Sequence, residues 1–318
     1  MLYRLLLIPS RIALYFYCRK IIINNKAMLQ QPGPLLIAAN HPNSFLDAII
    51  VDSLFKSPVY SLARGDAFAS KMITKILRSF HMLPVYRMSE GIENLENNYI
   101  TFDTCETLFK KNKVVLIFSE GGSKNEWHLR PLKKGTARLA LHAWRNNIPL
   151  KVLPLGINYS SFRYFGKNMF LNFGNVISKK QFSESLSEGK FIKIFDEKLK
   201  EELKKLVYEI EKNDHEKLKD HFFIKQPLAR KIFLFIPAIL GFIINMPLYL
   251  LIHLIIKKRA NDHYDSIMTG ALILFYPLYV LAIALITYFI TKSLYSFVML
   301  IFVPVSAWSY LQLKNQIR

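Results

Sequence analysis

The sequence predicts an α/β domain with a mostly parallel central sheet flanked by helices, joined to an N-terminal membrane-interface helix and to C-terminal membrane helices. Short apolar runs of strand length alternate with polar stretches of helical length from residue 22 to about residue 223. A nearly uncharged tail follows, with apolar runs long enough to cross a bilayer. The alternating runs predict the fold class, and the apolar tail predicts association with a membrane.

Charge and hydropathy narrow the classes of protein that fit this chain. Its 318 residues include 43 Lys+Arg and 23 Asp+Glu, a formal net charge of +20, and 52% are hydrophobic. This hydrophobic fraction argues against disorder, and the concentration of charge in one long region argues against a fully embedded transporter. A basic, apolar chain favours a membrane surface and anionic substrates or partners. Nucleic acid would also fit the charge but predicts nothing about the apolar tail, so no nucleic-acid partner is expected.

Residues 1–25 are expected to form an N-terminal membrane-associated helix. Basic residues flank a short apolar run, and bulky tyrosines rather than small residues follow it, so a secretory signal is not indicated. An ordinary helix packed on the protein is the alternative. Cys18 and Cys105 lack Cys or His neighbours at metal-ligand spacing and predict neither a disulfide framework nor a zinc site. A reduced domain facing the cytoplasm is therefore expected.

Residues 26–223 are expected to form the α/β domain. Six runs have the length and content of strands: Leu35–Ala39, Val59–Leu62, Leu83–Tyr86, Val114–Ser119, Lys151–Ile157 and Met169–Phe173. Four helices are expected between them, at about Ser44–Phe55, Ala69–Ser79, Glu90–Asn112 and Gly135–Asn146. Open parallel sheets bind ligands where strands run into helices, so functional residues are expected at these junctions.

The C-terminal part divides into a charged and an apolar section. Apolar residues at three- and four-residue steps predict a charged helix over residues 190–219. Residues 230–318 then form a hydrophobic membrane region. It contains three apolar stretches, Ile232–Ile256, Ile267–Ile290 and Leu294–Leu313. The positive-inside rule places the basic catalytic region in the cytoplasm, but the basic residues 257–259 conflict with simple spanning, so spanning and re-entrant arrangements both stay open.

A histidine and an aspartate are the first candidates for chemistry. The segment LLIAANHPNSFLDA places His41 in a loop after an apolar strand and Asp47 on the helix that follows. This suits a general base whose tautomer is fixed by a carboxylate, although a histidine that caps a turn is the ordinary alternative. His215 and Asp220 have a similar spacing, but in a continuous helix they would point about 140° apart, and we assign them to surface charge.

Three further blocks accompany this pair along the chain. They are Arg87 after the short strand of MLPVYR, then Glu120, Gly121, Gly122, Ser123 and Lys124 after the strand VVLIFS, then the strand KVLPLGI with Pro154. Glycines after a strand let backbone N–H groups approach an anionic ligand, and basic residues supply charge. Each signal is weak alone, because EGG also fits a tight turn and Arg87 a surface arginine.

Taken in order, NHPNSFLD, LPVYR, FSEGGS and VLPLGI resemble the four blocks of the glycerolipid acyltransferase superfamily, the lysophosphatidate and glycerol-3-phosphate acyltransferases. The resemblance covers roughly Leu35–Ile157. Five residues rather than the usual four separate His41 from Asp47, and Ser119 stands where the family usually has proline. The longer first block, the run after the third block and the apolar C-terminal helices resemble the fungal-type glycerol-3-phosphate and dihydroxyacetone-phosphate branch.

The resemblance implies a role for each block. His41 would be the general base for an acceptor hydroxyl, with Asp47 orienting its imidazole. Arg87 would grip the acceptor phosphate, and Glu120 with Gly121 would help to hold the acceptor. Gly122, Ser123 and Lys124 are further substrate-binding candidates, and Arg130 is a weaker one. No metal or redox cofactor is expected.

We therefore expect a membrane-bound O-acyltransferase of phospholipid biosynthesis. It would transfer a fatty acyl group from acyl carrier protein or coenzyme A to lysophosphatidate or glycerol 3-phosphate, with its catalytic domain facing the cytoplasm. Its expected partners are the phospholipid membrane, the acyl thioester and the phosphorylated glycerol acceptor. The alternatives are an O-acyltransferase of a lyso-aminolipid, for which Arg87 should matter less, and a non-catalytic membrane-anchored protein on the same fold.

Overall fold

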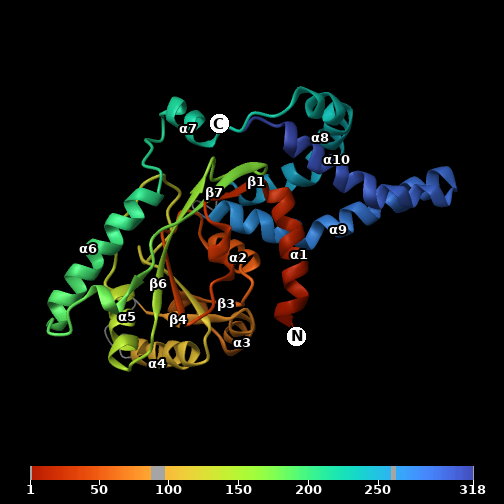
Figure 1. The fold of residues 1–318 in the computed structure, drawn as a ribbon. Helices are drawn as coiled ribbons and strands as arrows, with labels where there is room; N and C mark the ends of the chain where they lie inside the picture. Colours follow the sequence, from red (N-terminus) through yellow and green to blue (C-terminus); the bar gives the residue numbers. More distant parts are fainter. Residues whose placement is uncertain (1, 87–96, 259–262, 318) are drawn as a thin grey trace. The chain divides into compact units, whose positions relative to one another are not determined.

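The computed structural model describes residues 2–86, 97–258 and 263–317 (Figure 1). The chain forms two compact units. The first comprises the residues up to Leu7 together with Ile23–Asn158 and Phe170–Lys212, and the second comprises Ile8–Ile22, Tyr159–Met169 and the residues from Asn213 onwards.

A mostly parallel sheet is the frame of the α/β part of the chain. Its strands are β1 (Cys18–Ile23), β2 (Leu35–Ala39), β3 (Val59–Arg64), β4 (Met82–Val85), β5 (Val114–Phe118), β6 (Lys151–Tyr159), β7 (Lys167–Phe173) and β8 (Ile177–Ser178). They follow the order β1-β7-β6-β2-β5-β3-β4, and β8 pairs with β6. β2 lies between β5 and β6 and is parallel to both, and β3 is parallel to β4 and β5. The predicted α/β fold with a mostly parallel sheet is confirmed.

Helices cover the sheet of the first unit on both faces. They are α2 (Phe45–Leu54), α3 (Lys71–Ser79), α4 (Asn97–Lys110), α5 (Gly135–Arg145) and α6 (Glu188–Leu206), with short 3-10 helices at η1 (Lys26–Gln30), η2 (Gly65–Phe68) and η5 (Lys179–Gln181). Figure 1 shows α2 and α3 on the opposite side of the strands from α5 and α6. On the α5 side, Leu36 and Val115 are buried in one core with Ala140 and Phe195. Burial on both faces explains why β2 and β5 read as continuous apolar runs.

The second unit is mainly helical. From Ile8 onwards α1 (Leu2–Tyr17) belongs to it, and it continues with α7 (His215–Phe222), α8 (Leu228–Ile256), α9 (Tyr264–Thr291), η7 (Leu294–Val298) and α10 (Met299–Leu313). Three segments, Leu228–Ile256, Tyr264–Thr291 and Leu294–Leu313, are long and apolar enough to cross a membrane. Gly241 permits a close approach of α8 to α10, because a Cβ there would lie 2.0 Å from the Ser306 carbonyl oxygen.

The structure departs from the sequence expectations in two places. The N-terminal helix ends at Tyr17, and residues 18–23 form a strand instead of continuing the helix to residue 25. The expected helix over residues 190–219 is divided into α6 and α7, because the segment between them makes tertiary contacts. There, Ile210 forms an antiparallel bridge with Trp127. On α7, the side chains of His215 and Asp220 are both exposed, as expected of surface charge.

Candidate active site

His41 and Asp47 lie together at the end of β2. The strand ends at Ala39, the loop that follows carries His41, and Asp47 lies in the first turn of α2. The Nδ1 atom of His41 is 2.9 Å from Oδ2 of Asp47, whose side chain is fully buried, whereas the histidine side chain is 17% exposed. A proton on Nδ1 that is donated to the carboxylate leaves the lone pair on Nε2. Among the described residues nothing hydrogen-bonds to that nitrogen, so it can act as a base.

The loop itself helps to hold the carboxylate. The backbone N–H of Asn43 donates to the same Oδ2 atom of Asp47 at 2.8 Å. The short segment between the histidine and the aspartate therefore has a structural role of its own, and its length fixes which backbone amide reaches Asp47.

The ring of Phe118 packs against the imidazole of His41. It stacks on the ring of His41 with centroids 3.7 Å apart and planes inclined by 9°. The two residues meet because β2 and β5 are adjacent parallel strands in which Ala39 is paired with Phe118. The stacking restricts the imidazole to one plane, so its remaining freedom is small.

The carboxylate of Glu120 joins the two loops of the site. The side chain is 3% exposed, and its two oxygens accept hydrogen bonds from the backbone N–H groups of His41 and Arg130, both at 3.0 Å. Burial raises the pKa of Glu120 to about 7, against the lowering effect of these two hydrogen bonds. The carboxylate thus binds the main chain of His41 rather than its side chain.

Two more hydrogen bonds connect the same loops. The backbone N–H of Lys124 donates to the carbonyl oxygen of His41 at 3.2 Å, and the side-chain amide of Asn125 donates to the carbonyl oxygen of Pro42 at 2.8 Å. Both backbone groups of His41 are therefore bound by the third block. The position of the imidazole depends on residues about 80 positions further along the chain.

The other candidates of the third block lie in the same loop. Gly121 has φ of +67°, and a Cβ there would lie 2.8 Å from Cγ of Lys133, so the loop requires glycine. The carbonyl of Gly122 accepts a hydrogen bond from the Arg130 guanidinium at 2.9 Å. The side chain of Ser123 is half-buried, and that of Lys124 is exposed and pairs with Glu126 at 2.8 Å.

The second and fourth blocks flank this centre. Arg87 lies outside the described residues, and β4 ends two residues before it, beside β3. The fourth block forms β6. The buried side chain of Asn40 connects it to the site, since its amide donates to the Ile157 carbonyl at 3.0 Å and accepts from the Ile157 N–H at 2.7 Å. These two hydrogen bonds fix the end of β2, where the loop that carries His41 begins.

Comparison with known proteins finds a family model that covers this site. Residues 20–158, which contain all four blocks, match the family model described as Acyltransferase. This stretch of the chain is therefore similar to the Acyltransferase family. A search of solved structures found PlsC, the 1-acyl-sn-glycerophosphate (LPA) acyltransferase from Thermotoga maritima, at 13% identity and a TM-score of 0.40, over 62% of this chain and 76% of that chain. No curated protein matches the chain.

Sequence reasoning missed several supporting residues of this site. From the sequence, Phe118 is predicted only as part of a strand, and Asn40, Asn43 and Asn125 are not named as site residues. An asparagine directly after a buried strand is a usable signal for Asn40, because a polar side chain at that place needs a partner. The contact of Phe118 with the histidine has no local signal, since it depends on the register of two strands.

Proposed function

We propose that the protein transfers a fatty acyl group from an acyl thioester, of acyl carrier protein or of coenzyme A, to a hydroxyl group of lysophosphatidate or glycerol 3-phosphate. With lysophosphatidate the product would be phosphatidic acid. The observation that carries the proposal is the hydrogen-bonded His41–Asp47 pair, with a histidine side chain that is 17% exposed, inside the stretch that matches the Acyltransferase model. Phospholipid synthesis is the setting that fits this chemistry and the apolar C-terminal helices.

In the proposed reaction His41 is the general base. Its Nε2 atom takes the proton of the acceptor hydroxyl while the hydroxyl oxygen attacks the thioester carbonyl. The tetrahedral intermediate then collapses, the C–S bond breaks, and the leaving thiolate receives the proton from the imidazolium. The products are an ester and a free thiol. Asp47 stabilises the imidazolium and keeps the proton of the resting histidine on Nδ1.

The other blocks would bind the acceptor. A guanidinium suits phosphate oxygens, so Arg87 is the proposed phosphate ligand, and Ser123 and Lys124 are placed in the loop beside His41 to contribute. For Glu120, whose oxygens both accept backbone N–H groups, we propose that its contribution to acceptor binding is made through the shape of this loop.

The apolar helices would keep the enzyme at its lipid substrates. Three segments of the second unit have the length and composition of membrane spans. The net charge of +20 favours anionic head groups and the phosphates of coenzyme A or the acidic surface of a carrier protein. We propose that the catalytic domain faces the cytoplasm, where acyl thioesters are made.

A transfer assay with matched histidine variants tests the proposal. Detergent-solubilised protein is given labelled acyl carrier protein or acyl-coenzyme A, with each acceptor offered separately. His41→Ala should reduce transfer about a thousandfold, whereas His215→Ala, which removes an exposed histidine of α7, should leave it unchanged. Arg87→Gln should raise the KM for the phosphorylated acceptor. A folded protein that transfers to neither acceptor, but does acylate a lyso-aminolipid, would overturn the acceptor assignment. Equal rates for wild type and His41→Ala would overturn the mechanism.

A further inference from the structure

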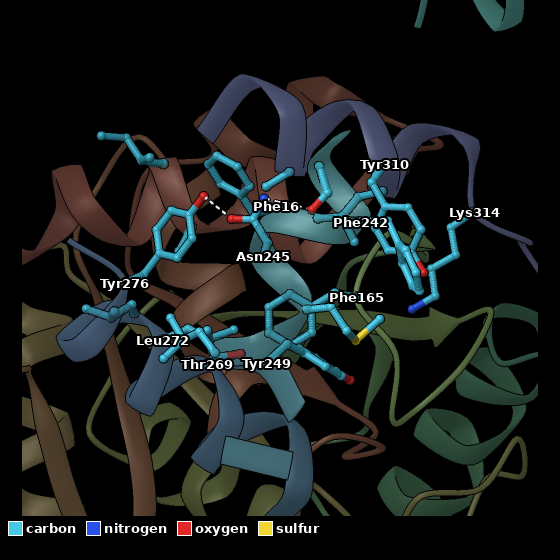
Figure 2. Close-up of a pocket in the computed structure, with 18 of the residues that line it drawn as sticks. Phe16, Phe165, Phe242, Asn245, Tyr249, Thr269, Leu272, Tyr276, Tyr310 and Lys314 are labelled. Atoms are coloured by element: carbon cyan, nitrogen blue, oxygen red, sulfur yellow. Dashed lines mark hydrogen bonds between the residues drawn. The ribbon is translucent and has the colours of Figure 1, made fainter. Parts of the chain in front are cut away.

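The second unit contains an apolar cavity that the proposed reaction does not use. Its volume is about 460 Å³, within the range of small-molecule sites in proteins, and its walls come from α1, α8, α9, α10 and the segment before β7. Figure 2 shows the aromatic side chains that form much of the lining: Phe16, Phe165, Phe242, Tyr249, Tyr276 and Tyr310. Walls of this kind fit a hydrocarbon chain.

A few polar groups interrupt the apolar walls. Asn245 and Tyr276 are hydrogen-bonded to each other: the tyrosine hydroxyl donates to the asparagine Oδ1 at 2.9 Å. Thr269 is different. It lines the cavity, it is 6% exposed, and no described residue hydrogen-bonds to its buried hydroxyl. A buried hydroxyl without a partner is costly, so this group indicates a ligand oxygen or nitrogen inside the cavity.

Positive charge gathers at one edge of the cavity, around the last turn of α10. Lys314 lines the cavity, and Figure 2 shows its ammonium group turned towards the other lining side chains. The Arg19 guanidinium donates to the carbonyl oxygen of Leu311, another lining residue, at 3.0 Å, and also to the carbonyl oxygen of Lys314. Arg230 binds the side chain of Gln312 in the same turn at 2.9 Å. We call Arg19, Arg230 and Lys314 the cationic edge.

The guanidinium of Arg19 does not use all of its hydrogen-bond donors among the described residues. Nε and Nη1 of Arg19 are buried and have no hydrogen-bond partner among the described residues. Neither Arg19 nor Arg230 forms an ion pair with a carboxylate of any described residue. Burial, together with the nearby charge of Arg230, lowers the pKa of Arg19 to about 10, so the arginine is still charged at neutral pH. An anion at this edge would relieve the repulsion between the two guanidinium groups.

We propose that the second unit binds an anionic amphiphile, with its alkyl chain in the aromatic-lined cavity and its phosphate or similar head group at the cationic edge. None of the residues that line the cavity belongs to the candidate active site, and binding does not require acyl transfer. Two sources share this chemistry: a single-chain alkyl phosphate and a diacyl phospholipid of the membrane.

Photo-labelling of the full chain tests the site. The probe is dodecyl phosphate with a diazirine in its chain, the protein is the His41→Ala variant in neutral detergent, and labelled peptides are mapped by mass spectrometry. Using this variant separates the test from the proposed function, since binding should persist without catalysis. We expect labels on residues 9–16, 241–249 or 269–277. Competition by unlabelled dodecyl phosphate and by diacyl phosphatidylglycerol in parallel identifies the source of the natural ligand.

Two variants and one control make the result decisive. Ala307→Phe, which fills the cavity, should abolish labelling, and Lys314→Gln should weaken competition by dodecyl phosphate about tenfold. Lys219→Gln makes the same charge change on the exposed face of α7 and should have no effect. The proposal is overturned if a folded Ala307→Phe protein labels like its parent. Because that variant could also unfold the unit, Lys314→Gln provides a second test. If dodecyl phosphate competes equally well in the folded Lys314→Gln protein and in its parent, the proposal is equally overturned.

Discussion

The titration of Glu120 should make the free energy of unfolding depend on pH. Burial raises the pKa of this carboxyl group to about 7 in the folded protein, compared with 4.5 for an ordinary glutamate. A group that binds its proton more tightly in the folded state stabilises the fold when it is protonated. Its contribution is therefore fully present below pH 4.5 and is lost as the pH rises through 7.

The size of this effect follows from the two pKa values. At 1.36 kcal/mol for each pKa unit, the wild-type protein should lose about 3 kcal/mol of unfolding free energy between pH 4.5 and pH 8 through this group. Glu120→Gln removes the titration. The amide offers a single acceptor oxygen to two N–H donors, those of His41 and Arg130, which costs about 1–3 kcal/mol at every pH. The variant should thus be the less stable protein at pH 5, and the difference should shrink to near zero or reverse by pH 8.

Denaturant unfolding followed by tryptophan fluorescence measures the difference. Trp127 and Trp144 are buried in the first unit and report on it. The matched control is Glu201→Gln on the exposed surface of α6, whose unfolding curve should differ from that of wild type by a constant amount. If the gap between wild type and Glu120→Gln is also constant from pH 5 to pH 8, the carboxyl group titrates as an ordinary glutamate and the reasoning is refuted.

Three further substitutions test other contacts. Asp47→Ala should reduce acyl transfer to within about tenfold of the His41→Ala level, because the base loses the group that fixes its tautomer, and a rate near wild type would contradict this. Phe118→Leu should lower kcat by about two- to tenfold through loss of ring stacking of about 0.5–1.5 kcal/mol, and an unchanged kcat would assign the ring to packing alone. Lys167→Met leaves the carboxylate of Asp265 buried without its ammonium partner. It should destabilise the second unit by about 3–5 kcal/mol in thermal unfolding, and adding Asp265→Asn should recover part of the loss.

The sequence predicted those features whose cause is local. The strand Leu35–Ala39 was placed with its exact bounds, since five consecutive buried apolar residues between turns are recognisable without any partner. His41 and Asp47 were also predicted, because a strand, a loop and the first turn of a helix are enough to bring residues six positions apart into contact. The apolar helices of the tail needed only length and composition.

Features that depend on distant contacts escaped prediction. CRKIII follows the apolar helix α1 without a break in hydrophobicity, so the change to strand β1 at Cys18 has no local marker. The helical pattern of residues 190–219 is overridden where Tyr208 donates its backbone N–H to the Asn158 side chain at 2.8 Å. Likewise, nothing near Glu120 in the sequence shows that its partner is the N–H of a residue 79 positions earlier.

The contact of Glu120 changes what the third block means for catalysis. A block that only bound the acceptor would affect KM when altered. Here the glutamate accepts a hydrogen bond from the N–H of His41, and the N–H of Lys124 donates to the carbonyl of the same residue, so the block also fixes the main chain of the proposed base. The parallel strands β2 and β5 explain how the two loops meet. Adjacent parallel strands end at the same edge of the sheet and bring together loops that are remote in sequence. Glu120→Gln should therefore lower kcat while the KM of the acceptor changes little, whereas a rise in KM at constant kcat would return the residue to the acceptor site.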